Sequence, residues 1–101
     1  MKLGFVTAIL PELELEDVLA FAGAEDYDCI EVMCWPVGKA ERKFAGVTHI
    51  DVTDFSQAAA DDVNALCDKY EVELSGLGYY PNLLSADESE AEVAYTHLQR
   101  V

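Results

Sequence analysis

The sequence predicts an α/β fold in which helices cover a small parallel sheet. Three short apolar stretches, at residues 2–7, 29–34 and 72–78, alternate with segments whose apolar residues recur at helical spacing. Strands that alternate with helices in this way form parallel sheets through right-handed crossovers. None of the three stretches shows the polar side of a half-solvated antiparallel strand. The 101 residues are enough for one domain, spanning 1–101.

The first strand and helix have clear signals. Residues 2–7 (KLGFVT) form a short apolar run that carries Phe and Val, as a buried strand does. A helix is expected from Leu15, and Gly23 lies near its expected end. Its apolar residues follow the spacing i, i+3, i+4 and i+7: Leu15, Val18, Leu19 and Ala22.

The second strand, residues 29–34 (CIEVMC), alternates its side chains between two faces. Ile30 and Val32 share one face, and Glu31 shares the other with Met33. A long segment without helical spacing follows at residues 35–53. Loops of this length in a compact domain are usually functional or disordered. The segment keeps large apolar residues, which is not the composition of a disordered chain: Trp35, Phe44, Val47 and Ile50.

The second half of the chain repeats the pattern. Asp54 and Gln57 resemble a capping box, and one apolar helix face follows: Ala59, Val63, Leu66, Cys67 and Tyr70. Residues 72–78 (VELSGLG) form the third strand. Ser85 or Asp87 caps the last helix, whose expected apolar face is Ala91, Ala94, Tyr95 and Leu98. No Gly, Asn or Pro closes this helix, so we expect it still to be running at Val101, as though the chain were cut there.

Composition excludes several classes of function. The formal net charge of −14 would repel nucleic acid and anionic membranes, so neither is expected as a partner. No stretch approaches the roughly 20 apolar residues of a membrane span, and the N-terminus is too short for a signal peptide. We therefore expect a cytoplasmic protein. Cys29, Cys34 and Cys67 match no zinc or redox spacing and are expected to be small buried hydrophobes.

Three parallel strands leave two unpaired sheet edges, which partners or further chain normally complete. One completion is a small flavodoxin-like domain, which needs about five strands. The other is the eightfold barrel of roughly 250 residues, of which this chain would be the first three units.

Three phrases resemble one family: KLGFVT at residues 2–7, residues 27–52, and VELSGLGYYPNLLSAD at residues 72–87. They are similar to the N-terminal portion of sugar phosphate isomerase/epimerase proteins of the xylose isomerase-like TIM-barrel superfamily. The most specific pieces are the Glu of the second strand (IEV) and the run LGYYPN after the third. The resemblance implies a truncated (β/α)8 barrel whose first three βα units are residues 1–101.

The resemblance also implies an activity. Such enzymes move a proton between carbons next to a sugar carbonyl, and they use a divalent metal ion: Mn, Mg, Co or Zn. Two glutamates, an aspartate and a histidine from later strands usually hold the metal, and those strands are not in this sequence. We therefore expect this chain to contain residues that bind a small sugar or polyol but no metal ligand. Residues 1–101 alone are expected to show no turnover. Exposed sheet edges are expected to lead to homo-oligomers.

A barrel places its active site at the carboxyl ends of its strands, which here makes Glu31 the first candidate. A carboxylate in an apolar strand costs several kcal/mol unless it is paired, so it either holds a substrate hydroxyl or forms a structural salt bridge. Trp35 follows that strand and either covers the apolar face of a sugar or packs the loop against Phe44 and Ile50.

Three further residues are substrate-binding candidates. Tyr80 and Asn82 follow the third strand and can hydrogen-bond sugar oxygens, although turn formation also explains Asn82. His49, with Asp51 in THID, suits a structural or substrate-rim role better than a catalytic one. His97, on the last helix, is expected to face solvent. The basic cluster of Lys39, Arg42 and Lys43 either attracts an anionic substrate or faces solvent.

A second reading of the chain needs no catalysis. In it, residues 1–101 are a self-contained α/β domain whose acidic helices bind a partner.

Overall fold

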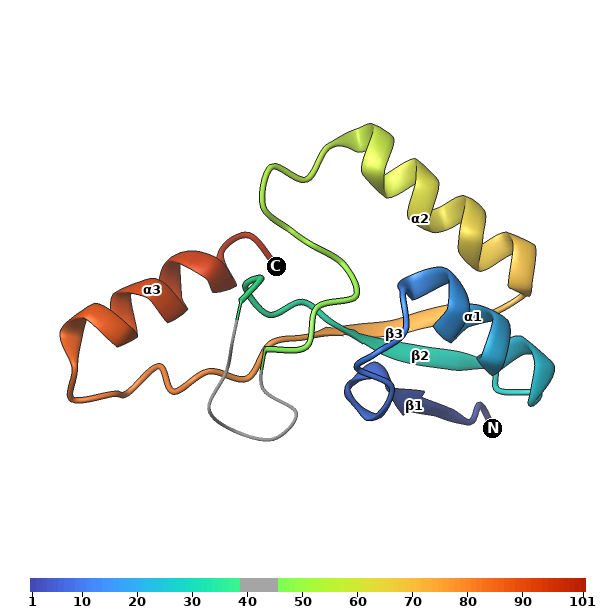
Figure 1. The fold of residues 1–101 in the computed structure, drawn as a ribbon, viewed down its shortest axis with the longest axis horizontal. Helices are drawn as coiled ribbons and strands as arrows, with labels where there is room; N and C mark the ends of the chain where they lie inside the picture. Colours follow the sequence, from blue (N-terminus) through green and yellow to red (C-terminus); the bar gives the residue numbers. More distant parts are fainter. Residues whose placement is uncertain (39–45) are drawn as a thin grey trace.

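Within residues 1–38 and 46–101, which the computed structural model describes, three strands and three α-helices alternate along the chain (Figure 1). Their order is β1 (Gly4–Val6), a 3-10 turn η1 (Thr7–Ile9), α1 (Leu15–Ala24), β2 (Cys29–Met33), α2 (Gln57–Tyr70), β3 (Glu73–Gly78) and α3 (Glu88–Leu98). All strand pairs are parallel, so the α/β class and the parallel sheet are confirmed.

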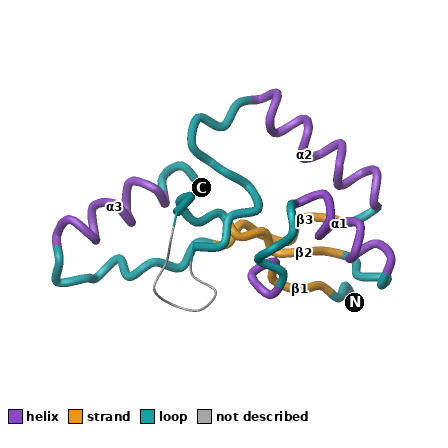
Figure 2. Tube along the Cα trace, in the orientation of Figure 1, coloured by secondary structure: helices purple, strands orange, loops and turns teal. Residues whose placement is uncertain are grey.

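The strands lie side by side in the order β1-β2-β3, with β2 in the centre (Figure 2). Between β2 and β3 the register shifts: Ile30 pairs with Leu74, but Glu31 pairs with Gly76. Ser75 is therefore an extra residue on β3. The shift brings Gly76 and Gly78 opposite Glu31 and Met33 on the neighbouring strand.

One face of the sheet carries the main core. The four apolar residues predicted for α1 are all buried there, against Ile30 and Val32 of β2: Leu15, Val18, Leu19 and Ala22. Burial of each large aliphatic side chain contributes roughly 1.5–3 kcal/mol, so this helix face is the main anchor of the sheet. α2 packs beside α1 on the same face with partly buried residues only: Val63, Leu66, Cys67 and Tyr70.

The start of α2 differs from the prediction. The helix begins after Ser56, whose side chain accepts a hydrogen bond from the Ala59 amide at 3.1 Å. Asp54 lies two residues earlier with φ at +54°, in a left-handed turn, and so cannot serve as the cap. The expectation of Asp54 as the cap was wrong because this turn moves the helix start along the chain.

α3 begins as expected and ends earlier. Asp87 is the N-cap, and its carboxylate accepts from the amides of Ser89 and Glu90. The helix ends at Leu98, not beyond Val101, because the amides of Arg100 and Val101 close a tight turn on the His97 carbonyl.

The buried side of α3 agrees with the prediction only in part. Ala94 and His97 are buried, whereas Tyr95 is 60% exposed and Leu98 is 38% exposed. The reason is that α3 does not cover the sheet. It lies beyond the carboxyl ends of the strands, apart from α1 and α2 (Figure 1), and packs on loop segments there.

Residues 35–53 were predicted to be a long loop. The described parts, 35–38 and 46–53, contain neither a helix nor a named strand, only an isolated antiparallel bridge between Cys34 and Thr48. No helix in the described part of the chain combines the length and the apolarity needed to cross a bilayer.

Candidate functional site

A carboxylate and a phenol meet at the carboxyl end of the sheet. Glu31 of β2 is half-buried on the face opposite the main core, and Tyr80 follows the end of β3. The Tyr80 hydroxyl donates a hydrogen bond to Oε1 of Glu31. Two of the five predicted site residues are therefore in direct contact.

Glycines of β3 make room for the Glu31 carboxylate. A Cβ atom at Gly78 would lie 3.0 Å from Oε1 of Glu31 and 2.6 Å from Sδ of Met33. At Gly76 the nearest atom would be Cγ of Glu31, at 3.8 Å, which is an ordinary contact. The register shift at Ser75 places both glycines on this face, so a local irregularity of β3 shapes the site.

The pair can bind a hydroxylated ligand. An ionised carboxylate accepts several hydrogen bonds, and a phenol both donates and accepts. Tyr80 is 62% exposed, so the pair is open to solvent and to ligands. The two ion pairs in the described residues join Lys2 to Glu73 and Lys69 to Glu16, so Glu31 belongs to neither.

Trp35 belongs to an aromatic cluster at the carboxyl end of the sheet. Its ring lies edge-on to Tyr79 with centroids 5.0 Å apart, and Tyr79 lies edge-on to His97 at 4.7 Å. Trp35 also packs against Ala8 and Met33. Burial raises the pKa of the Tyr79 phenol. The cluster connects the end of β2 to α3.

The expectation that His97 faces solvent was wrong. Its side chain is 4% exposed, and Nε2 lies 2.7 Å from the Cys34 carbonyl, to which it donates in the matching tautomer. His97 lies three residues after Ala94, which is the other buried residue of α3. That spacing was the available signal, but nothing in the sequence shows that this side of the helix faces the end of β2. Sequence reasoning also missed Tyr79.

His49 and Asp51 do not form a hydrogen-bonded pair. Nε2 of His49 lies 3.1 Å from the Leu10 carbonyl, and its backbone amide bonds to the Met33 carbonyl. The Asp51 carboxylate accepts from the Thr53 amide at 2.9 Å, as a turn-forming residue does. These contacts hold the long loop against η1 and β2.

Asn82 lies beside a hollow next to the aromatic cluster. Its Oδ1 accepts from the Leu84 amide at 3.1 Å, which is the turn chemistry foreseen for this residue. The hollow has a volume of about 510 Å³ and lies between Trp35, Tyr79 and the first turns of α3. Lys39, Arg42, Lys43 and Phe44, named above as candidate or packing residues, lie outside the described residues.

Metal ligands do not converge in the described ranges, 1–38 and 46–101. No group of three or more His, Cys, Asp or Glu side chains there is arranged to hold a metal ion. These residues therefore do not by themselves fit the divalent metal that the family resemblance implies.

Fold and site together define an open α/β sheet protein with a carboxylate–phenol pair at the carboxyl ends of parallel strands. Comparison of the chain with family models, curated proteins and solved structures gave no match.

Proposed function

We propose that residues 1–101 form the first three βα units of a TIM barrel, and that they supply the substrate side of a sugar or polyol isomerase/epimerase site. The observation that carries this proposal is the contact between Glu31 and Tyr80. It lies at the strand ends where barrels bind their substrates, and on the sheet face that points into a barrel.

The strand order supports a barrel over a flavodoxin-like domain. In a barrel each strand is added beside the previous one, and all helices lie outside. Here the order is β1-β2-β3, and α1 and α2 cover the same face. A flavodoxin-like sheet begins with the order 2-1-3 because the chain reverses direction after its second strand.

In the proposed site, the residues of this chain bind and orient the substrate. The Glu31 carboxylate accepts hydrogen bonds from substrate hydroxyls, and the Tyr80 phenol holds that carboxylate in place and donates to a sugar oxygen. The ring of Trp35, fixed by Tyr79, limits access of water from one side. A metal ion would supply Lewis-acid chemistry in the enzymes of this family, but we derive no step through it because its ligands are not among these residues.

The test is an NMR titration of the ¹⁵N-labelled chain with a panel of aldoses, ketoses, their phosphates and linear polyols. We expect amide shifts to concentrate at the end of β2 and around Tyr80. Glu31→Gln and Tyr80→Phe should each remove most of the response.

Tyr95→Phe is the matched control, because Tyr95 is equally exposed but lies on α3 away from the pair. Titrations that leave the Glu31 and Tyr80 regions unshifted, or that are the same in Glu31→Gln as in the unmodified chain, would refute the proposed function.

A further inference from the structure

Two adjacent hollows lie along α2 and the edge strand β3, on the face that carries the main core. One hollow, at the start of α2, is lined by Phe55, Val63, Leu74 and Leu77 together with Asn64. A second hollow, at the end of α2, shares Asn64 and Leu74 with the first. Because the hollows share two lining residues, they are direct neighbours, and we call the pair the α2–β3 groove.

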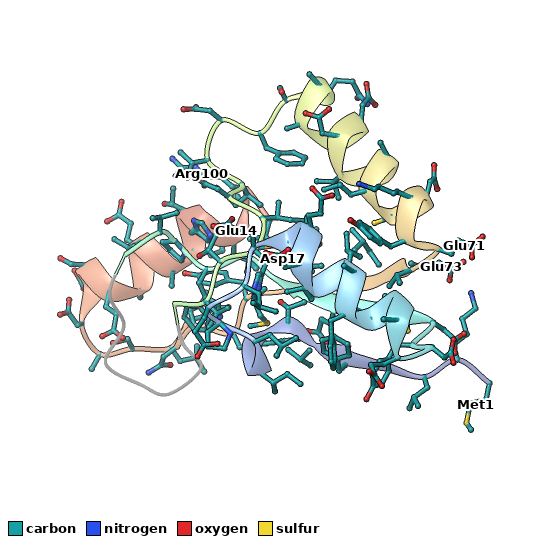
Figure 3. The ribbon with its side chains drawn as sticks, turned by 45° about the vertical axis from the view of Figure 1, so that its right-hand side comes forward. Met1, Glu14, Asp17, Glu71, Glu73 and Arg100 are labelled. Carbon is teal, nitrogen blue, oxygen red and sulfur yellow. The ribbon has the colours of Figure 1, made fainter. Side chains whose placement is uncertain are left out.

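The two ends of the groove differ in chemistry. The end near the start of α2 is apolar, with Phe55 43% exposed and Leu77 45% exposed. The other end is lined by Asp68, Glu71 and Glu73. Figure 3 shows Glu71 and Glu73 together where α2 turns into β3. Of these three carboxylates, only Glu73 has an ion-pair partner in the described residues, Lys2.

The groove lies where α/β proteins commonly place a further helix. α1 and α2 already lie on this face, and the space beside the last helix of such a layer normally receives another helix. In the described part of the chain, the apolar end is also lined by Ile50 and Val52, which precede α2, and by Arg100 and Val101, which follow α3. α3 itself lies beyond the strand ends (Figure 1).

The carboxylates at one end of the groove favour a positively charged occupant. A second copy would bring acidic helices toward acidic residues, since all three helices carry carboxylates and the chain has a net charge of −14. A basic helix is attracted instead, and its positive side chains meet Asp68 and Glu71 when its apolar face covers Phe55 and Leu77.

We propose that the α2–β3 groove binds a basic amphipathic helix of another polypeptide. The apolar face of that helix packs on Phe55, Val63 and Leu77, and its Lys or Arg residues pair with Asp68 and Glu71. This site lies on the opposite face of the sheet from Glu31. In a barrel completed by further chain, the helix of the next βα unit would lie against the same groove, so the proposal applies to the 101-residue chain without that unit.

The probe is a fluorescent synthetic helix of about five turns, with Leu at i, i+3, i+4 and i+7 and Lys along its flanks. A scrambled peptide of the same composition and a peptide with Glu in place of Lys are the controls. Fluorescence anisotropy with the full 101-residue chain should show binding of the first peptide only. Its affinity should fall as salt is raised.

Two variants locate the binding. Leu77→Ser removes an exposed apolar contact and should weaken binding about tenfold. The double variant Asp68→Asn/Glu71→Gln should weaken it at low salt and flatten the salt dependence. Val93→Ser, at a 63% exposed apolar site on α3, is the matched control and should leave binding unchanged.

Cysteine alkylation gives an independent measure of position. Cys67 lines the acidic end of the groove, whereas Cys29 lies at the start of β2. The bound peptide should slow alkylation of Cys67, mapped by mass spectrometry, and leave that of Cys29 unchanged.

Absence of binding, equal binding of the scrambled or acidic peptide, or equal binding to the Leu77→Ser variant would each overturn the proposal. So would sedimentation that shows self-association abolished by Leu77→Ser, because a second copy would then occupy the groove.

Discussion

A missing side chain at Gly78 decides where the Glu31 carboxylate can lie. Gly76 and Gly78 both flank Glu31, but only at Gly78 would a Cβ atom crowd its Oε1. The neighbouring atoms there belong to side chains, Met33 Sδ and Glu31 Oε1, which can move without disturbing the backbone. A side chain at Gly78 would therefore move the carboxylate and leave the backbone of the sheet in place.

We predict that Gly78→Ala displaces the Glu31 carboxylate and removes the response to sugars and polyols. The free energy of unfolding should fall by only about 1–2 kcal/mol, because side chains and not backbone must shift. Gly76→Ala, with 3.8 Å of room, should keep the response. Urea denaturation and the NMR titration measure the two effects. A Gly78→Ala chain that still responds like the unmodified chain would contradict the prediction.

The Cys34 thiol gives a pH-dependent prediction at the same scale. Burial raises its pKa from an ordinary 9.0 to about 11, with a hydrogen bond from the Gly78 backbone acting weakly in the other direction. Between these values the unfolded chain loses the proton while the folded chain keeps it. The contribution of Cys34 to stability is thus intact below about pH 9 and is lost as the pH rises toward 11, by about 2 kcal/mol.

Urea denaturation at several pH values between 8 and 11 checks this prediction. The Cys34→Ala variant should be less stable at pH 8 because a buried side chain is removed, but it should lose less stability as the pH rises. Comparison of the two chains isolates Cys34 from Cys67 and Tyr79, whose pKa values burial also raises. Parallel pH profiles would show that the prediction fails.

At the scale of elements, α1 and α3 differ in how they are held. α1 is buried along a whole face, but α3 buries only Ala94 and His97, at the carboxyl end of the strands. The contact of His97 with the Cys34 carbonyl is therefore a large part of what holds α3.

This difference also explains which elements could be predicted. Helical spacing identifies the buried side of α1 correctly because the helix packs on a flat sheet. The same reasoning gave Ala94 correctly for α3 but was wrong for Tyr95 and Leu98, because α3 packs on loops whose course is not a local property of the sequence. The predicted cap of α2 was wrong for a similar reason, since the left-handed turn at Asp54 has no unique sequence signal.

We predict that His97→Ala loosens α3 selectively. The variant leaves the buried Cys34 carbonyl without this partner, which costs about 1–3 kcal/mol. Amide hydrogen exchange should accelerate in α3 and stay unchanged in α1 and β2. Thr96→Ala, at an exposed neighbouring position, is the control. Uniform acceleration over the whole chain would mean that His97 stabilises the fold as a unit instead.

At the scale of the whole molecule, the sheet is covered by helices on one face. The class of fold and the face of Glu31 could both be predicted, because strand alternation is a local property. The contact between Glu31 and Tyr80 could not, because it depends on a register shift between β2 and β3. The barrel, its substrate, its metal and a cytoplasmic location stay predictions.

The net charge gives a prediction for the whole molecule. At 0.01 M salt the screening length is about 30 Å, comparable to the molecular dimensions of 43 × 29 × 26 Å, so the excess carboxylates repel one another across the structure. Raising sodium chloride to about 0.15 M shortens that length to about 8 Å and should raise the urea midpoint. Choline chloride should act equally. A midpoint that falls with both salts would contradict this.

The most direct test of the central claim is the set of nuclear Overhauser contacts made by the Tyr80 ring in the free chain. Cross-peaks from the ring protons to the Hγ protons of Glu31 are expected, because the Tyr80 hydroxyl contacts this carboxylate at the carboxyl ends of the strands. A Tyr80 ring with no cross-peak to Glu31, and with contacts to other residues instead, would contradict the account.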